Sequence, residues 1–218
     1  TNLSAMADEQ TVADEHVDEE QEQRLDPEVA ARRQAALSFV RQWGDPVLKS
    51  RARPVDRFDD DLRTQIEQMG RLMEDALGIG LAATQLGVLR RLLVFQAGPD
   101  AEPTALANPE VEWLSDDVVV AEEGCLSLPR VSMDVERPLF VRVSGQDAEG
   151  KRIVIEAAGL EARVLQHEID HLDGVLILDR TTRPQRKGAL RALREGGTYH
   201  PPSDDDDEDE LREPRTDA

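Results

Sequence analysis

The sequence has one cysteine, four histidines and only 3% aromatic residues in a length of 218. A single cysteine cannot form a disulfide within the chain, so a disulfide-stabilised fold is excluded. There is neither a run of the ~20 apolar residues needed to span a membrane nor a charged-then-apolar secretion signal. With so few aromatic side chains, the core must consist mainly of Leu, Val, Ile and Ala. These absences predict a cytoplasmic protein whose one thiol stays reduced.

The negative charge is concentrated at the two ends of the sequence. The net charge is −20, but residues 1–26 hold nine acidic and one basic side chain, and residues 201–218 hold nine and two. Acidic runs such as 204–210 repel themselves and supply no core, so both ends are expected to be disordered. We therefore expect an acidic extension at 1–26, one folded domain at 27–185, a basic segment at 186–200 and an acidic tail at 201–218.

Two of the four histidines belong to His167-Glu168-Ile169-Asp170-His171, an H-E-x-x-H pattern. Residues four apart lie on one face of a helix, so both imidazoles can bind one metal ion. Glu168 then lies where it can take a proton from water on that metal. A chance pattern on a solvated helix is the alternative. A helix over 159–172 is favoured by an apolar stripe and two terminal glycines: Leu160, Val164, Leu165, Leu172, Gly159 and Gly174.

A catalytic metal site normally has three protein ligands and one open position. His200, the only histidine downstream, lies in a Gly/Pro-flanked segment beside the acidic tail and is a poor candidate. Cys125 lies upstream, in Glu123-Gly124-Cys125-Leu126-Ser127-Leu128-Pro129. A lone cysteine is often only a small buried hydrophobic residue. The sharper hypothesis is a thiolate that completes a His-His-Cys set, and the neighbouring Gly124, which permits close backbone approach, favours it.

Three motifs together resemble those of the peptide deformylases. They are Gly78-Ile79-Gly80-Leu81-Ala82-Ala83-Thr84-Gln85, then 123–129, then 166–174, in the family's order and at its approximate spacings. The resemblance extends from about residue 39 to 180, and three motifs in order are far more specific than one. It implies a metal-dependent hydrolase that removes the formyl group from the N-terminal formyl-methionine of newly synthesised proteins and releases formate. It also implies an α+β fold with mostly antiparallel sheets around the H-E-x-x-H helix.

The resemblance further implies a role for each site residue. Cys125, His167 and His171 would hold a divalent metal, with Fe²⁺ as the physiological ion and Zn²⁺, Ni²⁺ or Co²⁺ as substitutes. A thiolate with two imidazoles suits all of these ions, so affinity order alone does not choose between them. Glu168 would act as the general base. The amide of Gln85 and the backbone N–H of Leu126 would stabilise the oxyanion.

Substrate-binding residues are expected on both sides of the metal. The family pairs the backbone at Gly80 with the substrate as an added strand, and Leu160 and Val164 would line the methionine pocket. Glu123 and His167 are also expected to contact the substrate. Glu161 occupies a position that is commonly apolar in the family and is expected to face solvent. Arg130 and Arg137 follow the cysteine motif and could reach the far end of the peptide, but they are interpreted as solvated surface residues. Arg163 is expected to point elsewhere on the helix and to be uninvolved.

Local patterns predict the elements that carry these motifs. One helix begins after an Asp26 N-cap and runs to about residue 43, and another begins at Asp59 and ends near Leu77, with Gly78 as a left-handed cap. Strands are predicted at 92–95, 105–107, 118–121, 133–143 and 152–156, with a hairpin turn at 146–150. Clustered strands with helices at both ends favour an α+β fold with mostly antiparallel sheet.

The partners expected are formyl-methionyl nascent chains, with no membrane contact and a monomeric enzyme. The basic residues of 183–194 predict either a solvated helix packed weakly on the domain or a transient contact with ribosomal RNA. Two other classes of function stay open. A metallopeptidase would use the same His-Glu-His geometry on ordinary peptide bonds, without needing Cys125 or Gln85. A catalytically inactive binding protein would keep only the fold.

Overall fold

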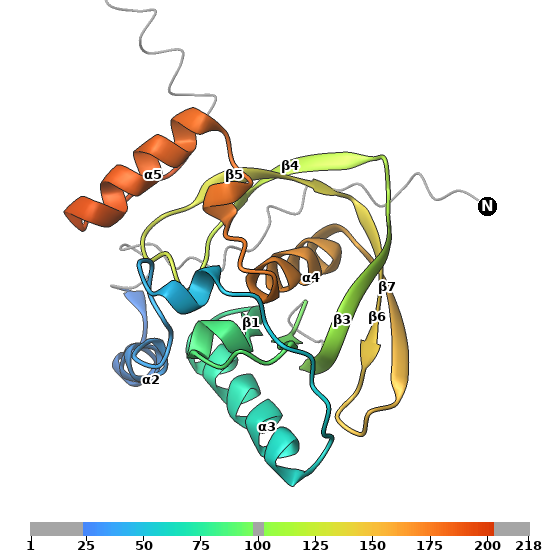
Figure 1. The fold of residues 1–218 in the computed structure, drawn as a ribbon. Coiled ribbons are helices and arrows are strands. Elements are labelled where there is room, and N and C mark those ends of the chain that lie inside the picture. Colours follow the sequence, from blue (N-terminus) through green and yellow to red (C-terminus); the bar gives the residue numbers. More distant parts are fainter. Residues whose placement is uncertain (1–23, 98–102, 203–218) are drawn as a thin grey trace, which may run out of the picture.

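Two antiparallel sheets and a helix between them form the centre of the protein, in a computed structural model that describes residues 24–97 and 103–202 (Figure 1). The five-stranded sheet has the order β1 (Gly80–Ala82), β2 (Leu92–Phe95), β3 (Thr104–Leu114), β6 (Phe140–Gln146) and β7 (Arg152–Ala158). The two-stranded sheet pairs β4 (Val118–Glu123) with β5 (Met133–Pro138). Helix α4 (Gly159–Leu172) contacts strands of both sheets. The predicted α+β fold is confirmed.

The outer helices begin where their capping residues predict. Asp26 caps α2 (Pro27–Leu37) by accepting from the Glu28 N–H, and Asp59 caps α3 (Asp60–Asp75) by accepting from the Leu62 N–H. Helix α2 ends at Leu37, not near residue 43 as predicted, because the N–H groups of 41 and 43 donate to other segments. The remaining helices are η1 (Pro46–Lys49), η2 (Ala83–Leu86), η3 (Ile177–Asp179) and α5 (Arg183–Glu195).

The end of α3 differs from the prediction by one residue. Leu77, not Gly78, has the left-handed backbone, with φ of 60°. The N–H of Gly78 donates to the Met73 carbonyl at 2.9 Å and that of Leu77 to the Glu74 carbonyl at 3.0 Å, which is a Schellman ending. Glycine at 78 is needed for space, since a Cβ there would lie 3.1 Å from Leu126 Cδ1.

Two strand predictions need correction. The strand predicted at 105–107 continues as β3 to Leu114, because a register shift between Ala107 and Glu110 accommodates Pro109 within the strand. The single strand predicted at 133–143 is two strands, β5 and β6, which belong to different sheets. The chain crosses between the sheets at Leu139, whose N–H donates to the Asp117 carbonyl at 2.8 Å. The strand at 92–95 and helix α4 have the predicted bounds.

Three buried apolar clusters surround the centre, and they hold α4 and the cysteine segment in place. One lies between α3 and strands β1 and β2, and a second lies between the large sheet and α4. The third contains Cys125 and the buried face of α5, Ala189 and Ala192. Helix α5 begins at Arg183, so the expected boundary at 185/186 falls inside it. The acidic extension and tail lie almost entirely outside the described residues.

Among the described residues, no helix combines the length and the apolar character required to cross a membrane.

Candidate metal centre and active site

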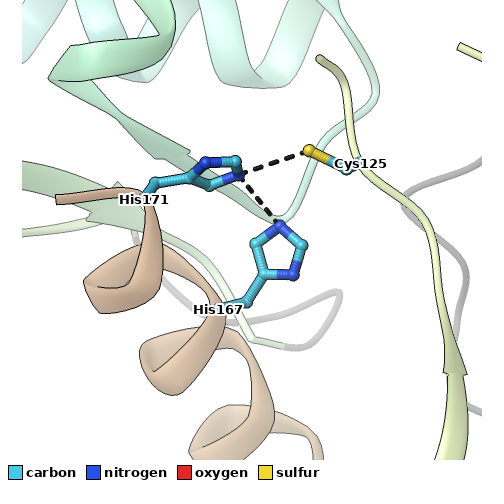
Figure 2. A group of neighbouring side chains, drawn as sticks. All are labelled: Cys125, His167 and His171. Atoms are coloured by element: carbon cyan, nitrogen blue, oxygen red, sulfur yellow. Dashed lines mark hydrogen bonds between the residues drawn. The ribbon is translucent and has the colours of Figure 1, made fainter. Parts of the chain in front are cut away.

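Cys125, His167 and His171 converge on one point (Figure 2). The two imidazoles project from successive turns of α4, and the thiol comes from the loop that follows β4. His171 Nε2 lies 3.1 Å from His167 Nε2 and 3.3 Å from Cys125 Sγ. All three side chains are buried, and their ligand atoms all lie within 4.8 Å of one another. The residues are 42 or more positions apart between the cysteine and the helix, yet they form one cluster.

This cluster fits a transition-metal ion. Metal–nitrogen bonds of about 2.0–2.1 Å and a metal–sulfur bond of about 2.3 Å at tetrahedral angles separate two nitrogens by roughly 3.4 Å, and nitrogen from sulfur by roughly 3.6 Å. The observed separations of 3.1 and 3.3 Å are close to these values. Burial lowers the pKa of His171 well below its ordinary value, and the charges of His167 and Arg137 act in the same direction. A neutral imidazole is the form that binds metal.

The protonation of His167 is fixed by Glu123. The carboxylate Oε2 of Glu123 lies 3.0 Å from His167 Nδ1. Burial opposes ionisation of Glu123, but hydrogen bonds from Arg137 and His167 more than offset it, so the pKa of this carboxyl lies well below its usual range. An ionised carboxylate only accepts hydrogen bonds, so Nδ1 must carry the proton. In the neutral, metal-binding form of the ring, His167 Nε2 then has the lone pair, and it faces His171.

A buried group of charges holds Glu123 in this position. Arg137 donates to both carboxylate oxygens of Glu123 at 2.9 Å, and Arg163 donates to Oε1 at 2.7 Å. Arg137 also donates to Asp170 at 2.6 Å, and Asp170 accepts in addition from Arg180. Burial lowers the pKa of Arg137, but the bonds and charges of Glu123 and Asp170 raise it by more. The net pKa lies above its ordinary value, and the guanidinium stays charged. The network thus connects the outer end of η3 to the metal-facing imidazole.

Glu168 follows His167 in α4 and is completely buried. A Cβ at position 80 would lie 2.9 Å from Glu168 Cδ, so only glycine leaves room for this carboxyl. Glu168 is thus the group that packs closest to Gly80, and the expected pairing of the Gly80 backbone with a substrate stays a prediction. The N–H of Ala82 donates to Gln85 Oε1 at 2.8 Å, which turns the amide nitrogen of Gln85 toward Ser127 Oγ at 3.4 Å and Cys125 Sγ at 3.9 Å. An amide donor therefore points toward the metal cluster.

Comparison with known proteins identifies this arrangement. The model of the polypeptide deformylase family matches residues 38–187. The chain belongs to the peptide deformylase family. Its members are metal-dependent hydrolases that remove the N-formyl group from nascent polypeptides. Peptide deformylase 1 of Corynebacterium glutamicum is 46% identical over 167 residues, which are 76% of this chain and 99% of that protein.

Solved deformylase structures agree with the fold. The crystal structure of the Synechococcus elongatus enzyme in complex with actinonin is 43% identical, with a TM-score of 0.68 over 73% of this chain and 88% of that one. The Thermotoga maritima peptide deformylase is 44% identical, with a TM-score of 0.64 over 66% and 96% of the two chains. Both likenesses place the chain's described domain in the deformylase fold.

Two residues expected to contact the substrate have side chains that are engaged within the protein. The carboxylate of Glu123 accepts from Arg137 and Arg163 and lies 3.0 Å from His167 Nδ1. His167 Nε2 is directed to His171. A contact of either residue with substrate stays a prediction.

The interpretation of Arg137 and Arg163 as solvated or uninvolved was wrong. Their exposed fractions are only 4% and 5%. The sequence held a signal for each. Arg137 lies on the same inward-facing side of β5 as Met133 and Val135, because alternate residues of a strand share one face. Arg163 precedes His167 by four residues and so lies on the same face of α4.

The other residues named from the sequence lie on α4 or near the α5 end of the domain. Leu160 and Val164 pack in the cluster between α4 and the large sheet, as core residues do. Glu161 is partly buried, and burial raises the pKa of its carboxyl, so the expectation of a solvent-facing residue holds only in part. His200 contacts Ser132 and Glu122, and Arg130 donates to the Gly196 carbonyl at 2.8 Å.

Proposed function

We propose that this deformylase binds its divalent metal through Cys125, His167 and His171, with Fe²⁺ as the physiological ion and Zn²⁺, Ni²⁺ or Co²⁺ as substitutes. The observation that carries the proposal is the convergence of one sulfur and two ring nitrogens on a buried point beside Glu168. A divalent cation bound there acts as a Lewis acid and lowers the pKa of water toward neutrality. The donor set of one thiolate and two imidazoles suits all four ions.

Glu168 is proposed as the general base, which takes a proton from the attacking water and delivers it to the departing amine. Its complete burial, against a glycine that leaves room for its carboxyl, supports this role. The amide of Gln85 and the N–H of Leu126 are proposed to donate to the oxygen that becomes negative on the formyl group. The fixed orientation of the Gln85 amide supports its part in this pair.

The substrate is proposed to pair with β1. This strand contains Gly80 and is at the edge of the large sheet, with β2 as its neighbour on one side, so it can accept an added strand. Leu160 and Val164, which lie one turn apart on α4 before His167, are proposed to form part of the methionine pocket as well as the core.

Helix α5 is proposed to make the contact with the ribosome through the basic residues of 183–194. The side chains of Arg183, Arg186, Lys187, Arg191 and Arg194 are all exposed, while the apolar residues Ala189 and Ala192 face the domain. Since nascent formylated chains leave cytoplasmic ribosomes, we place the enzyme in the cytoplasm. One chain supplies every residue of the site, which supports action as a monomer. Co-sedimentation with ribosomes that does not change when these charges are neutralised contradicts the contact.

The central experiment compares a formyl-methionyl peptide with the same peptide lacking the formyl group. The protein is loaded anaerobically with Fe²⁺ or with each substitute ion, and formate release and peptide cleavage are measured separately. We expect formate only from the formylated peptide and no cleavage of a peptide bond in either peptide. The highest rate per bound metal is expected with Fe²⁺. Cleavage of the unformylated peptide is the result expected of a metallopeptidase. No reaction with any ion is the result expected of an inactive binding protein.

A further inference from the structure

The segment between α2 and η1 forms hydrogen bonds to both loops that carry the proposed oxyanion donors. Residues 41–43 lie between the turn that follows α2 and Asp45, the N-cap of η1, and a second turn begins at Trp43. We call them the strap. The Arg41 N–H donates to the Gln85 carbonyl at 2.6 Å, and the Trp43 N–H donates to the Ser127 carbonyl at 2.9 Å. One short segment therefore bonds to η2 and to the cysteine loop.

Gln42 supplies the third link, through its side chain. Its Nε2 donates to the Leu126 carbonyl at 3.3 Å and to the Val40 carbonyl at 3.2 Å. The amide thus joins the loop that carries one proposed donor to the strap itself. Gln42 is exposed and contacts no metal ligand, so its replacement leaves the core and the metal cluster unchanged.

Both ends of the strap are fixed. At its start, the N–H of Phe39 and that of Val40 donate to the Ala36 and Leu37 carbonyls at the end of α2, each at 3.1 Å. At its end, the Asp45 N–H donates to the Gln42 carbonyl at 3.1 Å. A segment anchored in this way holds the loops it bonds to at a constant separation.

Oxyanion stabilisation depends on such a separation. The two donors must lie 2.7–3.1 Å from a single oxygen, and they gain their effect by being fixed before the charge develops. Gln85 and Leu126 are 41 residues apart and lie on different loops. The Gln85 amide contacts the cysteine loop only through distances of 3.4 and 3.9 Å. The strap adds a second connection between the two loops, because it donates to the Gln85 carbonyl at 2.6 Å and to the Leu126 carbonyl at 3.3 Å.

We infer that Gln42 is a positioning residue for deformylation: through the strap it holds the Leu126 N–H in register with the Gln85 amide. The inference rests on the proposed roles of these two donors. It assigns no contact with substrate to Gln42, and it predicts a change in turnover without a change in binding.

The test replaces Gln42 with Met, which has similar length and no donor. We expect kcat on a formyl-methionyl peptide to fall about fivefold, the effect of one neutral hydrogen bond, because the oxyanion is stabilised only in the transition state. KM, metal retention against a chelator and the melting temperature are expected to stay at their original values. Gln42→His, whose ring N–H has similar reach, is expected to keep at least half of the original kcat.

Gln65→Met is the matched control. Gln65 lies on α3 and lines one cavity with Arg41, but its side chain accepts from Arg90 at 2.8 Å and makes no hydrogen bond to the strap among the described residues. Its kcat is expected to be unchanged. Equal kcat in the Gln42→Met and Gln65→Met variants overturns the inference. A Gln42→His variant as slow as Gln42→Met also overturns it. So does a fall in kcat that comes with an equally large rise in KM or an equal loss of metal.

Gln85→Leu, measured in the same series, separates the two levels of the argument. If the donor assignment is correct, this variant loses about 10²–10³-fold in kcat. If Gln85→Leu keeps its full kcat, the proposed oxyanion donors are wrong and the strap has nothing to position. If Gln85→Leu is impaired and Gln42→Met is not, the donors stand and only the positioning role of Gln42 is wrong.

Discussion

The two histidines of the metal centre lie one turn apart on α4, but the regions behind them differ. Behind His167, the Nδ1 atom faces an ionised Glu123, which two buried arginines hold in place. Behind His171, the Nδ1 atom is buried and has no hydrogen-bond partner in the described part of the chain. His171 belongs to no ion pair among the described residues, and the Thr84 hydroxyl donates to its carbonyl at 3.1 Å.

This difference separates two tasks. The charged region behind His167 sets the tautomer and direction of a ligand, and buried charges of this kind are rigid because moving any one of them leaves another unpaired. The region around His171 is here called the neutral region. It includes Gln85, proposed to stabilise the oxyanion, and Glu168, proposed as the general base. The ion pairs of Glu123 with Arg137 and Arg163 thus hold a metal-facing imidazole in place, whereas Gln85 and Glu168 are proposed to act in the reaction itself.

The largest effect is expected from Glu168→Gln, which removes the general base of the neutral region. General acid–base catalysis contributes about 10²–10⁴-fold, so we expect kcat to fall by a factor in this range. Glu168 is not a metal ligand in our proposal, so the variant should retain its metal. Formate release and metal content, measured on the same sample, check both statements.

Glu67→Gln provides the control for that variant, because it makes the same change on the exposed face of α3. Its kcat and metal content are expected to match the original enzyme. A Glu168→Gln variant that is active but depleted of metal would contradict our division of roles, since Glu168 would then act as a ligand.

The charged region is broken most directly by Glu123→Gln. The amide leaves the charges of Arg137 and Arg163 without their anion at a buried position, and breaking a buried ion pair costs about 3–5 kcal/mol. It also removes the ionised acceptor that orients His167, and loss of such a partner typically weakens metal binding about 10–100-fold. Urea unfolding measures the first effect, and competition with a chelator measures the second. An unchanged metal affinity would show that the charges serve stability alone.

The exposed pair of Asp179 with Lys49 shows what a similar carboxylate contributes near solvent. Burial raises the pKa of Asp179, but hydrogen bonds from Lys49 and the Leu176 N–H lower it more, and the net shift is downward. Asp179→Asn is expected to cost at most about 1 kcal/mol at neutral pH, since solvent screens the pair. The carboxylate's contribution is present above the unfolded pKa of about 3.9 and is lost as pH falls through the lower native pKa. Urea unfolding at pH 7 and pH 3 tests this sign.

The sequence was sufficient to predict which three side chains converge and the helix that carries two of them. Periodicity and terminal glycines defined 159–172, and the three motifs identified Cys125 as the third ligand candidate. Both predictions depend on local patterns or on an ordered set of motifs, which a single sequence contains. The strand at 92–95 was predicted for the same reason, as a short apolar run with clear ends.

The charged region could not be predicted in the same way. A charged residue is normally solvated, so the sequence alone favoured the surface for Arg137 and Arg163. Their burial depends on Glu123 and Asp170, which approach only after β5 and α4 pack together. The strap was missed for a related reason. Its bonds are made mainly by backbone groups of residues 41 and 43, and backbone groups leave no trace in the choice of side chain.

The smallest effect concerns the backbone that leads into the neutral region, at Leu77. An L-residue in the left-handed conformation costs about 1–2 kcal/mol, whereas glycine adopts it without that cost. Leu77→Ala and Leu77→Gly both remove the side chain, but only the second relieves the backbone. We expect Leu77→Gly to be more stable than Leu77→Ala by about 1 kcal/mol in urea unfolding. At the preceding Ala76, where φ is −75°, substitution by Gly should instead reduce stability by about 0.5–1 kcal/mol. A loss at both positions would mean that Leu77 is unstrained.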